Sequence, residues 1–288
     1  MNVARTPEEL PRARRAVAIG TFDGVHLGHR RVIDAARAAG LTTTVVTFDP
    51  HPRTAMGNRV ELLTTLERRV ELLADAGADE TLVVSFDLEL ARTRAEDFAE
   101  RFLGAIGADI VLAGPTFRFG HKRGGDLALL ERLGFDVRPV PIVEGVSSSA
   151  IRALLKAGEP ERAARLLGRP PDVEGLVVSG DARGGTLGFP TANLRLPPDL
   201  LVPRYGIYAG STREHRAAVS VGVNPHYGGA EQRVEAFLLD FEGDLYGERI
   251  VLELWRYLRG ERAFEDEEAL VAQIARDVDE TRTAARPC

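Results

Sequence analysis

The chain has 288 residues, a formal net charge of −6 at pH 7 and 44% hydrophobic residues, as is typical of a soluble globular protein. The negative charge argues against a nucleic-acid surface, and no run approaches the roughly 18 apolar residues of a membrane span. The start of the chain lacks the apolar core of a signal peptide, and the one cysteine, Cys288, excludes a disulfide framework and a thiolate metal site. The sequence therefore predicts a cytoplasmic protein of one large or two ordinary domains that binds neither nucleic acid nor membrane.

Residues 1 to about 168 alternate between strand and helix patterns. Strands are expected at residues 17–19, 42–48, 80–86, 109–113 and 137–140, and helices from about residue 28 and at 62–76, 94–106 and 126–133. Such alternation with short connections predicts a parallel, doubly wound α/β sheet covered by helices on both faces. Ligands bind such sheets at the carboxyl ends of the strands, near the topological switch point.

The first expected strand leads into a turn with two histidines. Residues 17–19 are apolar, Gly20 and Gly24 follow, and a helical pattern comes next. A helix N-terminus after a glycine-rich turn binds anions through its backbone N–H groups and its dipole. His26 and His29 are three residues apart and share a face if the turn is helical. Because few other ligand side chains can join them, this stretch predicts a nucleotide site, with purely structural histidines as the alternative.

Three further polar clusters follow expected strands. The first is a proline-rich turn with Asp49 and His51, and the second is a long basic, glycine-rich loop at 114–126. The third is a run of serines at 147–149 that is expected to cap a helix, with Arg152 in its first turn. Hydroxyls, cap N–H groups and an arginine make a second phosphate-binding helix start. Each cluster alone is weak, but all of them lie where this sheet would bind a ligand.

The second half has the pattern of an antiparallel β-domain. A stiff linker at 169–172 marks the predicted boundary between domains 1–168 and 169–288. Strands are expected at residues 173–178, 207–211, 217–223, 234–241 and 250–258, followed by an amphipathic helix at 266–282. Consecutive strands with Gly, Pro and Asp turns predict an antiparallel barrel or sandwich.

Two stretches of this β-domain carry candidate chemistry. A glycine-rich loop from residue 180 ends in Thr191 and Asn193, whose oxygens could hold a magnesium ion against phosphates. Glu235 lies between apolar residues on a largely buried strand, where a carboxylate must be paired or functional. The chain has no lysine after Lys156, so phosphoryl transfer there could not use a P-loop lysine. A barrel rim with an ordinary salt bridge is the alternative.

The ordered set of motifs resembles the bacterial bifunctional riboflavin kinase/FAD synthetase family across nearly the whole chain. The stretch Gly20–His29 looks like its first adenylyltransferase motif, with the HxGH pattern of the wider nucleotidyltransferase superfamily, and residues 48–52, 114–123 and 147–152 look like the next three. Residues 188–193, 205–208, the strand around Glu235 and residues 245–247 look like the riboflavin kinase module. The resemblance implies a nucleotidyltransferase domain followed by a kinase barrel with a C-terminal helix.

In the first domain, the resemblance implies that FMN attacks the α-phosphorus of ATP, giving FAD and pyrophosphate. His26 and His29 would bind the triphosphate, and Ser148, Ser149 and Arg152 would hold the departing phosphates; both histidines and Arg152 are expected to be catalytic. The implied ATP-binding residues are Gly20, Phe22, Asp23, Gly24, His26, His29, Ser148, Ser149 and Arg152. The implied flavin-binding residues are Asp49, His51, Thr116 and Phe119.

In the second domain, the resemblance implies that the 5′-hydroxyl of riboflavin attacks the γ-phosphorus of ATP. Glu235 would be the general base, and Thr191 and Asn193 would hold Mg²⁺. The implied ATP-binding residues are Gly180, Arg183, Gly184, Gly188, Pro190, Thr191 and Asn193. ATP is thus the expected co-substrate at both sites, with riboflavin and FMN as the flavin substrates and FMN and FAD as products.

The sequence departs from the family at a few positions. Thr116 stands where the family usually has Asp or Asn, and His226 where it has Thr. Two other functions are therefore weighed. One is a nucleotidyltransferase for a different phosphate ester with a regulatory flavin-binding barrel, and the other is a non-catalytic flavin sensor. The loop at 188–193 and Glu235 argue against the first.

Overall fold

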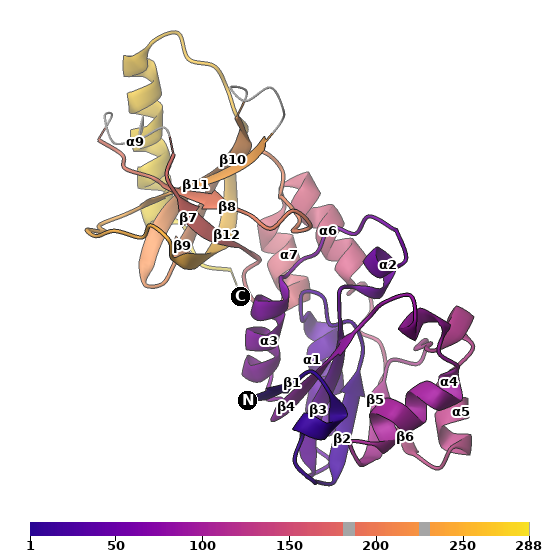
Figure 1. The fold of residues 1–288 in the computed structure, drawn as a ribbon. Coiled ribbons are helices and arrows are strands. Elements are labelled where there is room, and N and C mark those ends of the chain that lie inside the picture. Colours follow the sequence, from indigo (N-terminus) through magenta and orange to yellow (C-terminus); the bar gives the residue numbers. More distant parts are fainter. Residues whose placement is uncertain (181–187, 225–230, 288) are drawn as a thin grey trace. The chain divides into compact units, whose positions relative to one another are not determined.

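The computed structural model describes residues 1–180, 188–224 and 231–287, with the side chains of Asn224 and Glu231 also left out (Figure 1). The chain divides into two compact units, Met1–Ser147 and Ser148–Cys288. The predicted functional boundary at 168/169 stays a prediction.

The first unit is built on a six-stranded parallel sheet. Its strands are β1 (Asn2–Ala4), β2 (Arg15–Ile19), β3 (Thr42–Asp49), β4 (Glu80–Ser85), β5 (Ala108–Ala113) and β6 (Asp136–Pro139). Their order is β1-β4-β3-β2-β5-β6, and every neighbouring pair is parallel. The predicted parallel, doubly wound sheet is therefore confirmed.

Helices cover both faces of this sheet. The helical segments are η1 (Pro7–Glu9), α1 (Leu27–Arg37), α2 (Pro52–Ala55), α3 (Leu66–Asp75), η2 (Leu90–Arg92), α4 (Ala95–Phe98), η3 (Ala99–Gly104), η4 (His121–Arg123) and α5 (Leu127–Arg132). Along β2, Ala16 and Ala18 pack into the core under α1 and α3. Val17 and Ile19 face the core under α4, η3 and α5, as the alternation of side chains along a strand requires.

Two helices differ from their expected bounds for local reasons. The helix expected at 94–106 is an α-helix that widens into a π-helical turn, in which Ala105 N–H donates to the Glu100 carbonyl. The helix expected at 62–76 begins only at Leu66, because Thr65 is its N-cap and accepts the Arg68 N–H at 3.1 Å.

The order of the strands fixes where a ligand can bind. β2 lies between β3 and β5, so the chain leaves β2 toward one edge of the sheet and returns on its other side at β5. The carboxyl ends of β2 and β5 therefore flank the topological switch point. The segments after Ile19 and Ala113 lie at this edge, which is where two of the predicted polar clusters begin.

The second unit begins with two helices, α6 (Ser148–Ala157) and α7 (Pro160–Leu167). Its six barrel strands are β7 (Asp172–Val178), β8 (Ala192–Arg195), β9 (Gly206–Thr212), β10 (His215–Asn224), β11 (Glu231–Leu238) and β12 (Arg249–Arg259), followed by α9 (Glu267–Thr283). They close in the order β10-β11-β8-β7-β12-β9, and all pairs are antiparallel. The predicted barrel with a C-terminal helix is confirmed.

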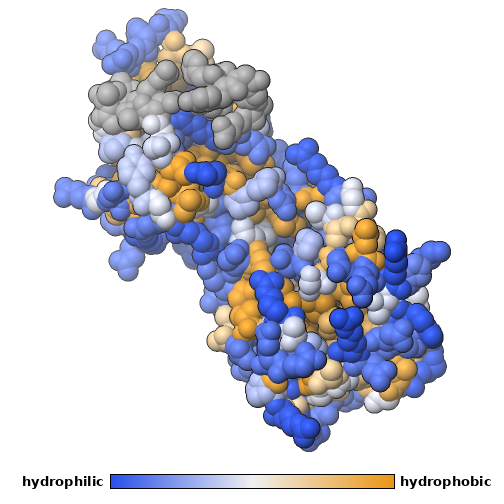
Figure 2. Space-filling view, viewed as in Figure 1, coloured by the Kyte–Doolittle hydropathy of each residue, from blue (hydrophilic) through white to orange (hydrophobic). Residues whose placement is uncertain are grey.

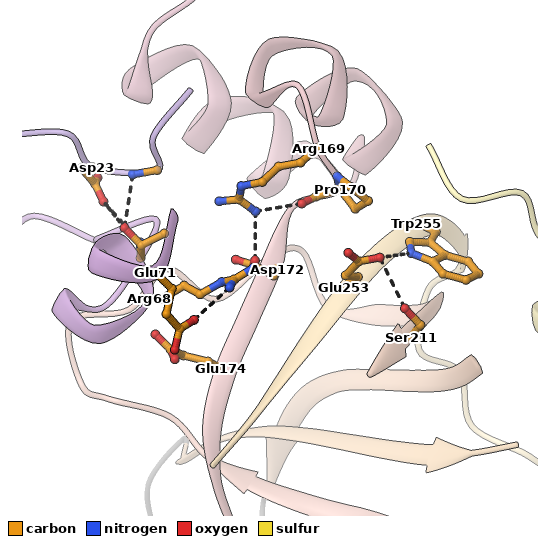
Figure 3. Close-up of polar contacts among 12 residues, drawn as sticks. Asp23, Arg68, Glu71, Arg169, Pro170, Asp172, Glu174, Ser211, Glu253 and Trp255 are labelled. Atoms are coloured by element: carbon orange, nitrogen blue, oxygen red, sulfur yellow. Dashed lines mark hydrogen bonds and ion pairs between the residues drawn. The ribbon is translucent and has the colours of Figure 1, made fainter. Parts of the chain in front are cut away.

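The barrel core is apolar, and polar contacts join its strands outside that core. Val234, Ala236 and Leu238 of β11 point into it. Figure 3 shows two of the ties: the Arg169 guanidinium bonds to Asp172 at 2.9 Å, and Glu253 accepts from the Trp255 indole at 2.8 Å and from a serine hydroxyl. The first contact lies at the start of β7, and the second joins the middle of β12 to β9.

Hydrophilic side chains cover most of the visible face of each unit, and apolar side chains form only limited areas (Figure 2). Among the described residues, none of the helices combines the length and the apolar character that crossing a membrane requires.

Candidate active sites

The two predicted histidines of the first unit lie stacked at the switch point. Their ring centroids are 3.6 Å apart with an interplanar angle of 13°. His26 is the N-cap of α1, and its Nδ1 accepts the His29 backbone N–H at 3.3 Å. An acceptor Nδ1 requires the proton of neutral His26 to sit on Nε2. The cap thus fixes both the orientation of the ring and the nitrogen that can donate to a ligand.

Both imidazoles are neutral at neutral pH. Burial lowers the pKa of His26 to about 4. Burial also holds the pKa of His29 well below its ordinary value, helped by charge repulsion from His26 and from Arg69. The Nδ1 atom of His29 is buried and has no hydrogen-bond partner within the described part of the chain. The pair can therefore offer N–H groups to an anion, and gains positive charge only when an anion offsets the cost of burying it.

The glycine between the histidines leaves room for the stack. A Cβ at Gly28 would lie 3.1 Å from Cε1 and 3.2 Å from Nδ1 of His26. Such contacts are tighter than normal carbon contacts, so any side chain at position 28 would push the imidazole away. The HxGH spacing thus has a steric reason in this structure.

The residues just before the histidines hold the loop in place. Asp23 is fully buried, and its Oδ1 accepts N–H groups of Leu63 at 2.9 Å and Thr64 at 3.2 Å. The Thr64 hydroxyl in turn accepts the Gly24 N–H at 3.2 Å. The Phe22 ring is buried and lies 5.1 Å from the His29 ring. Asp23 and Phe22 therefore support the loop from beneath with their side chains.

The other predicted residues of the first unit lie at neighbouring strand ends. Gly20 follows β2, and its N–H donates to the Val46 carbonyl. Asp49 ends β3, and the nearly buried His51 is the N-cap of α2, with Nδ1 accepting the Arg53 N–H at 3.1 Å. His51 thus also carries its neutral-form proton on Nε2.

The loop at 114–126 carries two predicted flavin-binding residues, of which one is exposed and the other lies in the core. Thr116 is exposed. Phe119 is buried in the core, with its ring 5.7 Å from Phe98 and 5.6 Å from the partly buried Phe117. Backbone bonds between Phe119 and Gly125 close this loop. The flavin contacts predicted for Thr116 and Phe119 stay predictions.

The predicted phosphate clamp belongs to the other unit. Ser148 and Ser149 are the first two residues of α6, and Arg152 lies one turn further on and is half-buried. A serine-rich helix start of this kind suits a phosphate group. Its predicted role beside His26 and His29 stays a prediction.

The second candidate site lies on the outer surface of the barrel. Asn193 of β8 and Glu235 of β11 are directly opposite each other in the strand register. The Asn193 Oδ1 accepts from Nη2 of Arg233 at 2.9 Å and from Nε at 3.2 Å, and Arg233 also forms an ion pair with Glu235. Because residues 234 and 236 fill the core, Glu235 points outward, and its side chain is 23% exposed. The predicted buried strand is present, but the carboxylate lies on its open face.

The glycine-rich loop approaches Asn193 closely. A Cβ at Gly180 would lie 2.3 Å from Nδ2 of Asn193, so any side chain at position 180 would displace this amide. The same Nδ2 donates to the Thr191 carbonyl at 3.3 Å. Gly188 and Pro190 are exposed before β8. The predicted ATP-binding residues Arg183 and Gly184, and the departure at His226, lie outside the described residues.

The side-chain oxygens of Asn193 and Glu235 suit a hard cation such as Mg²⁺. The Asn193 Oδ1 and the Glu235 carboxylate already share one cation, the guanidinium of Arg233, and Mg²⁺ prefers oxygen ligands together with phosphates and water. Within the described ranges, no group of three or more His, Cys, Asp or Glu residues could hold a metal. A metal at the barrel would therefore depend on Asn193, Thr191 and phosphate oxygens.

Sequence reasoning missed three residues that organise these sites. Thr64 anchors the histidine loop, Arg69 is fully buried beneath it, and Arg233 joins Asn193 to Glu235. The only signal for Arg233 was its spacing: it lies two positions before Glu235, so the two side chains share one face of the strand. Thr64 and Arg69 contact residues 20 to 50 positions away, which no local pattern shows.

Family models cover both halves of the chain. Residues 9–150 match the FAD synthetase family and residues 167–285 match the riboflavin kinase family. These ranges contain the histidine pair and the Asn193–Glu235 pair, respectively.

Whole-chain relatives give the same result. Proteins named bifunctional riboflavin kinase/FMN adenylyltransferase are 36% identical in Listeria monocytogenes, covering 96% of this chain and 94% of the relative, and 33% identical in Bacillus subtilis, covering 93% and 92%. A solved structure from Streptococcus pneumoniae, named there a macrolide-efflux protein, is 30% identical with a TM-score of 0.88 and covers 98% of this chain and 99% of its own. On the family models and these relatives, the chain belongs to the bifunctional riboflavin kinase/FMN adenylyltransferase family.

Proposed function

We propose that the two activities of the family are divided between the two folds, with the boundary near residue 168. The α/β fold adenylylates FMN with ATP to give FAD and pyrophosphate, and the barrel phosphorylates riboflavin with ATP to give FMN. The observation that carries this proposal is that each fold has its own polar cluster, the stacked His26 and His29 in one and the paired Asn193 and Glu235 in the other.

In adenylyl transfer, a phosphate oxygen of FMN attacks the α-phosphorus of ATP, and the bond to the bridging oxygen of pyrophosphate breaks. Negative charge grows on the leaving pyrophosphate. Nε2–H of His26 and the neutral ring of His29 supply hydrogen-bond donors to this charge, and the N-cap bond fixes the orientation of the His26 ring in advance. Both rings lie in a largely buried site, where fixed donors stabilise a transition state most strongly. Ser148, Ser149 and Arg152 are proposed to bind the departing phosphates.

In the kinase reaction, Glu235 accepts the proton of the riboflavin 5′-hydroxyl as that oxygen attacks the γ-phosphorus of ATP. Mg²⁺ bound by Thr191 and Asn193 would neutralise charge on the phosphates. The Arg233 guanidinium, which now bonds to both Asn193 and Glu235, holds these side chains at neighbouring positions of the barrel surface. The Mg²⁺ requirement and the cytoplasmic address belong to this proposal.

The test is turnover of the purified protein with defined flavins. Riboflavin with ATP and MgCl₂ should give FMN and then FAD by chromatography, and FMN with ATP should give FAD and one pyrophosphate per FAD. Flavin binding without turnover would contradict the proposal, as would adenylylation of another phosphate ester in place of FMN. EDTA in excess of MgCl₂ should stop FMN formation.

A further inference from the structure

Arg69 is a buried cation under the histidine loop. It lies on α3 and its exposed fraction is 0%. Its Nη1 donates to the Phe48 carbonyl at 2.9 Å and to the Thr21 carbonyl at 3.3 Å, with the Thr47 hydroxyl at 3.4 Å. Thr21 lies in the loop after β2 and Phe48 near the end of β3, so one guanidinium joins the two segments that lead to His26 and to His51.

The environment of Arg69 differs from that of a purely structural arginine. Arg15, at the other end of β2, is equally buried, and all three of its guanidinium nitrogens have partners, which include Glu80 and the carbonyls of Ile106 and Pro11. In Arg69, by contrast, Nε and Nη2 are buried without a hydrogen-bond partner among the residues that the structure describes. Buried N–H groups left open are rare and costly in proteins, and they call for a functional reason.

The charge of Arg69 acts on its surroundings. Burial lowers its pKa, while the carboxylates of Asp23 and Asp49 raise it and keep the guanidinium charged. After burial and the neighbouring His26, this charge is the third cause that holds the pKa of His29 down. Arg69 thus combines contacts to both loops with an electrostatic effect on the imidazole pair.

We propose that Arg69 is a positioning residue for adenylyl transfer: its guanidinium fixes the loop that carries His26 against the end of β3 and places a permanent positive charge behind the two imidazoles. The inference rests on the proposed function of the first unit. Arg69 does not touch the reacting atoms, because its side chain is fully buried. It acts by holding the two loops in register and by setting the field in which His29 binds an anion.

The experiment compares three variants of the full chain. Arg69→Met removes the charge but keeps much of the shape, Arg69→Lys keeps the charge but loses the forked donor, and Arg15→Lys makes the same conservative change at the matched structural arginine. FAD synthesis from FMN, FMN synthesis from riboflavin, thermal unfolding and the pH profile of FAD synthesis are measured for each.

Arg69→Met should lower kcat for FAD synthesis by about 10- to 100-fold and leave FMN synthesis within about twofold. Removing the repulsion raises the pKa of His29, so the acid limb of the pH profile should move to higher pH. Arg69→Lys should lower kcat with the acid limb unmoved, and Arg15→Lys should change only thermal unfolding.

The inference is overturned if Arg69→Met loses no more FAD synthesis than Arg15→Lys does and if its acid limb stays at the same pH as in the wild type. If Arg69→Met does not fold, Arg69→Lys decides: a kcat at least about tenfold below that of Arg15→Lys supports the inference, and equal values reject it. Wild-type protein that makes no FAD would instead refute the proposed function, so the two failures are distinguishable.

Discussion

Acid should destabilise the first unit through His26. The pKa of this imidazole is about 4 in the folded chain, because burial disfavours its charged form, and about 6.5 in an unfolded chain. Between these values the unfolded state binds a proton that the folded state does not, so stability falls as the pH drops from about 6.5 toward 4. With these two pKa values, the free energy of unfolding falls by about 2.5 kcal/mol between pH 7.5 and pH 4.5. His29, whose pKa is lowered too, adds to the loss.

The substitution His26→Asn isolates this effect. An asparagine oxygen can accept the His29 N–H at the N-cap as the imidazole does, but it does not titrate. Carboxylates titrate equally in both proteins and cancel in the comparison. Between neutral pH and pH 4.5, the free energy of unfolding should therefore fall by about 2.5 kcal/mol less in the variant than in the wild type. This difference corresponds to about 5 to 10 °C in unfolding temperature.

The assay must read the two units separately. The one tryptophan of the chain, Trp255, lies in the barrel, so its fluorescence reports the second unit and serves as an internal control. Hydrogen exchange of peptides from β2 and α1, measured by mass spectrometry over the pH range, reports the first unit. Equal acid sensitivity of α1 in the variant and the wild type would refute the view that His26 is buried as a neutral base.

Two glycines should show steric control of the sites. Gly28→Ala should reduce kcat for FAD synthesis at least about tenfold because its Cβ displaces the His26 ring, and an unchanged kcat would contradict this. The unfolding temperature should change little, because alanine favours the helix by about 1 kcal/mol and displacing the His26 N-cap costs about as much. Gly180→Ala should reduce FMN synthesis at least about tenfold by pushing the Asn193 amide away, with FAD synthesis from FMN intact. Gly260→Ala, where a Cβ meets nothing closer than 3.4 Å, is the control, and an equal effect there would reject the reasoning.

Much of the first unit could be predicted because its signals are local. The strand expected at 42–48 extends by one residue to Asp49, and the strand expected at 109–113 begins one residue earlier. Apolar runs of this kind are buried on both faces of a parallel sheet, and their periodicity is visible without the fold. The location of His26 and His29 followed from the same logic, since a glycine turn after a buried strand leads to the edge where ligands bind.

What could not be predicted depends on contacts between distant residues. The resemblance implied that Asp23 binds ATP, which stays a prediction, but no local pattern showed that its carboxylate accepts backbone N–H groups about 40 residues away. Arg69 carried no signal of its own in the sequence, yet it is fully buried beneath the loop after β2 and bonds to the Thr21 carbonyl. The short strand β8 was not separated from the glycine-rich loop, because its four residues gain their partners only from β7 and β11.

The central claim, that two separate sites carry the two reactions, is tested most directly by Glu235→Gln assayed with each flavin in turn. The variant keeps the shape of the side chain but cannot accept the riboflavin proton. FMN formation from riboflavin should fall at least about a hundredfold, while conversion of FMN to FAD stays within about twofold of the wild type. Loss of both activities in a folded variant, or full retention of FMN formation, would contradict the account.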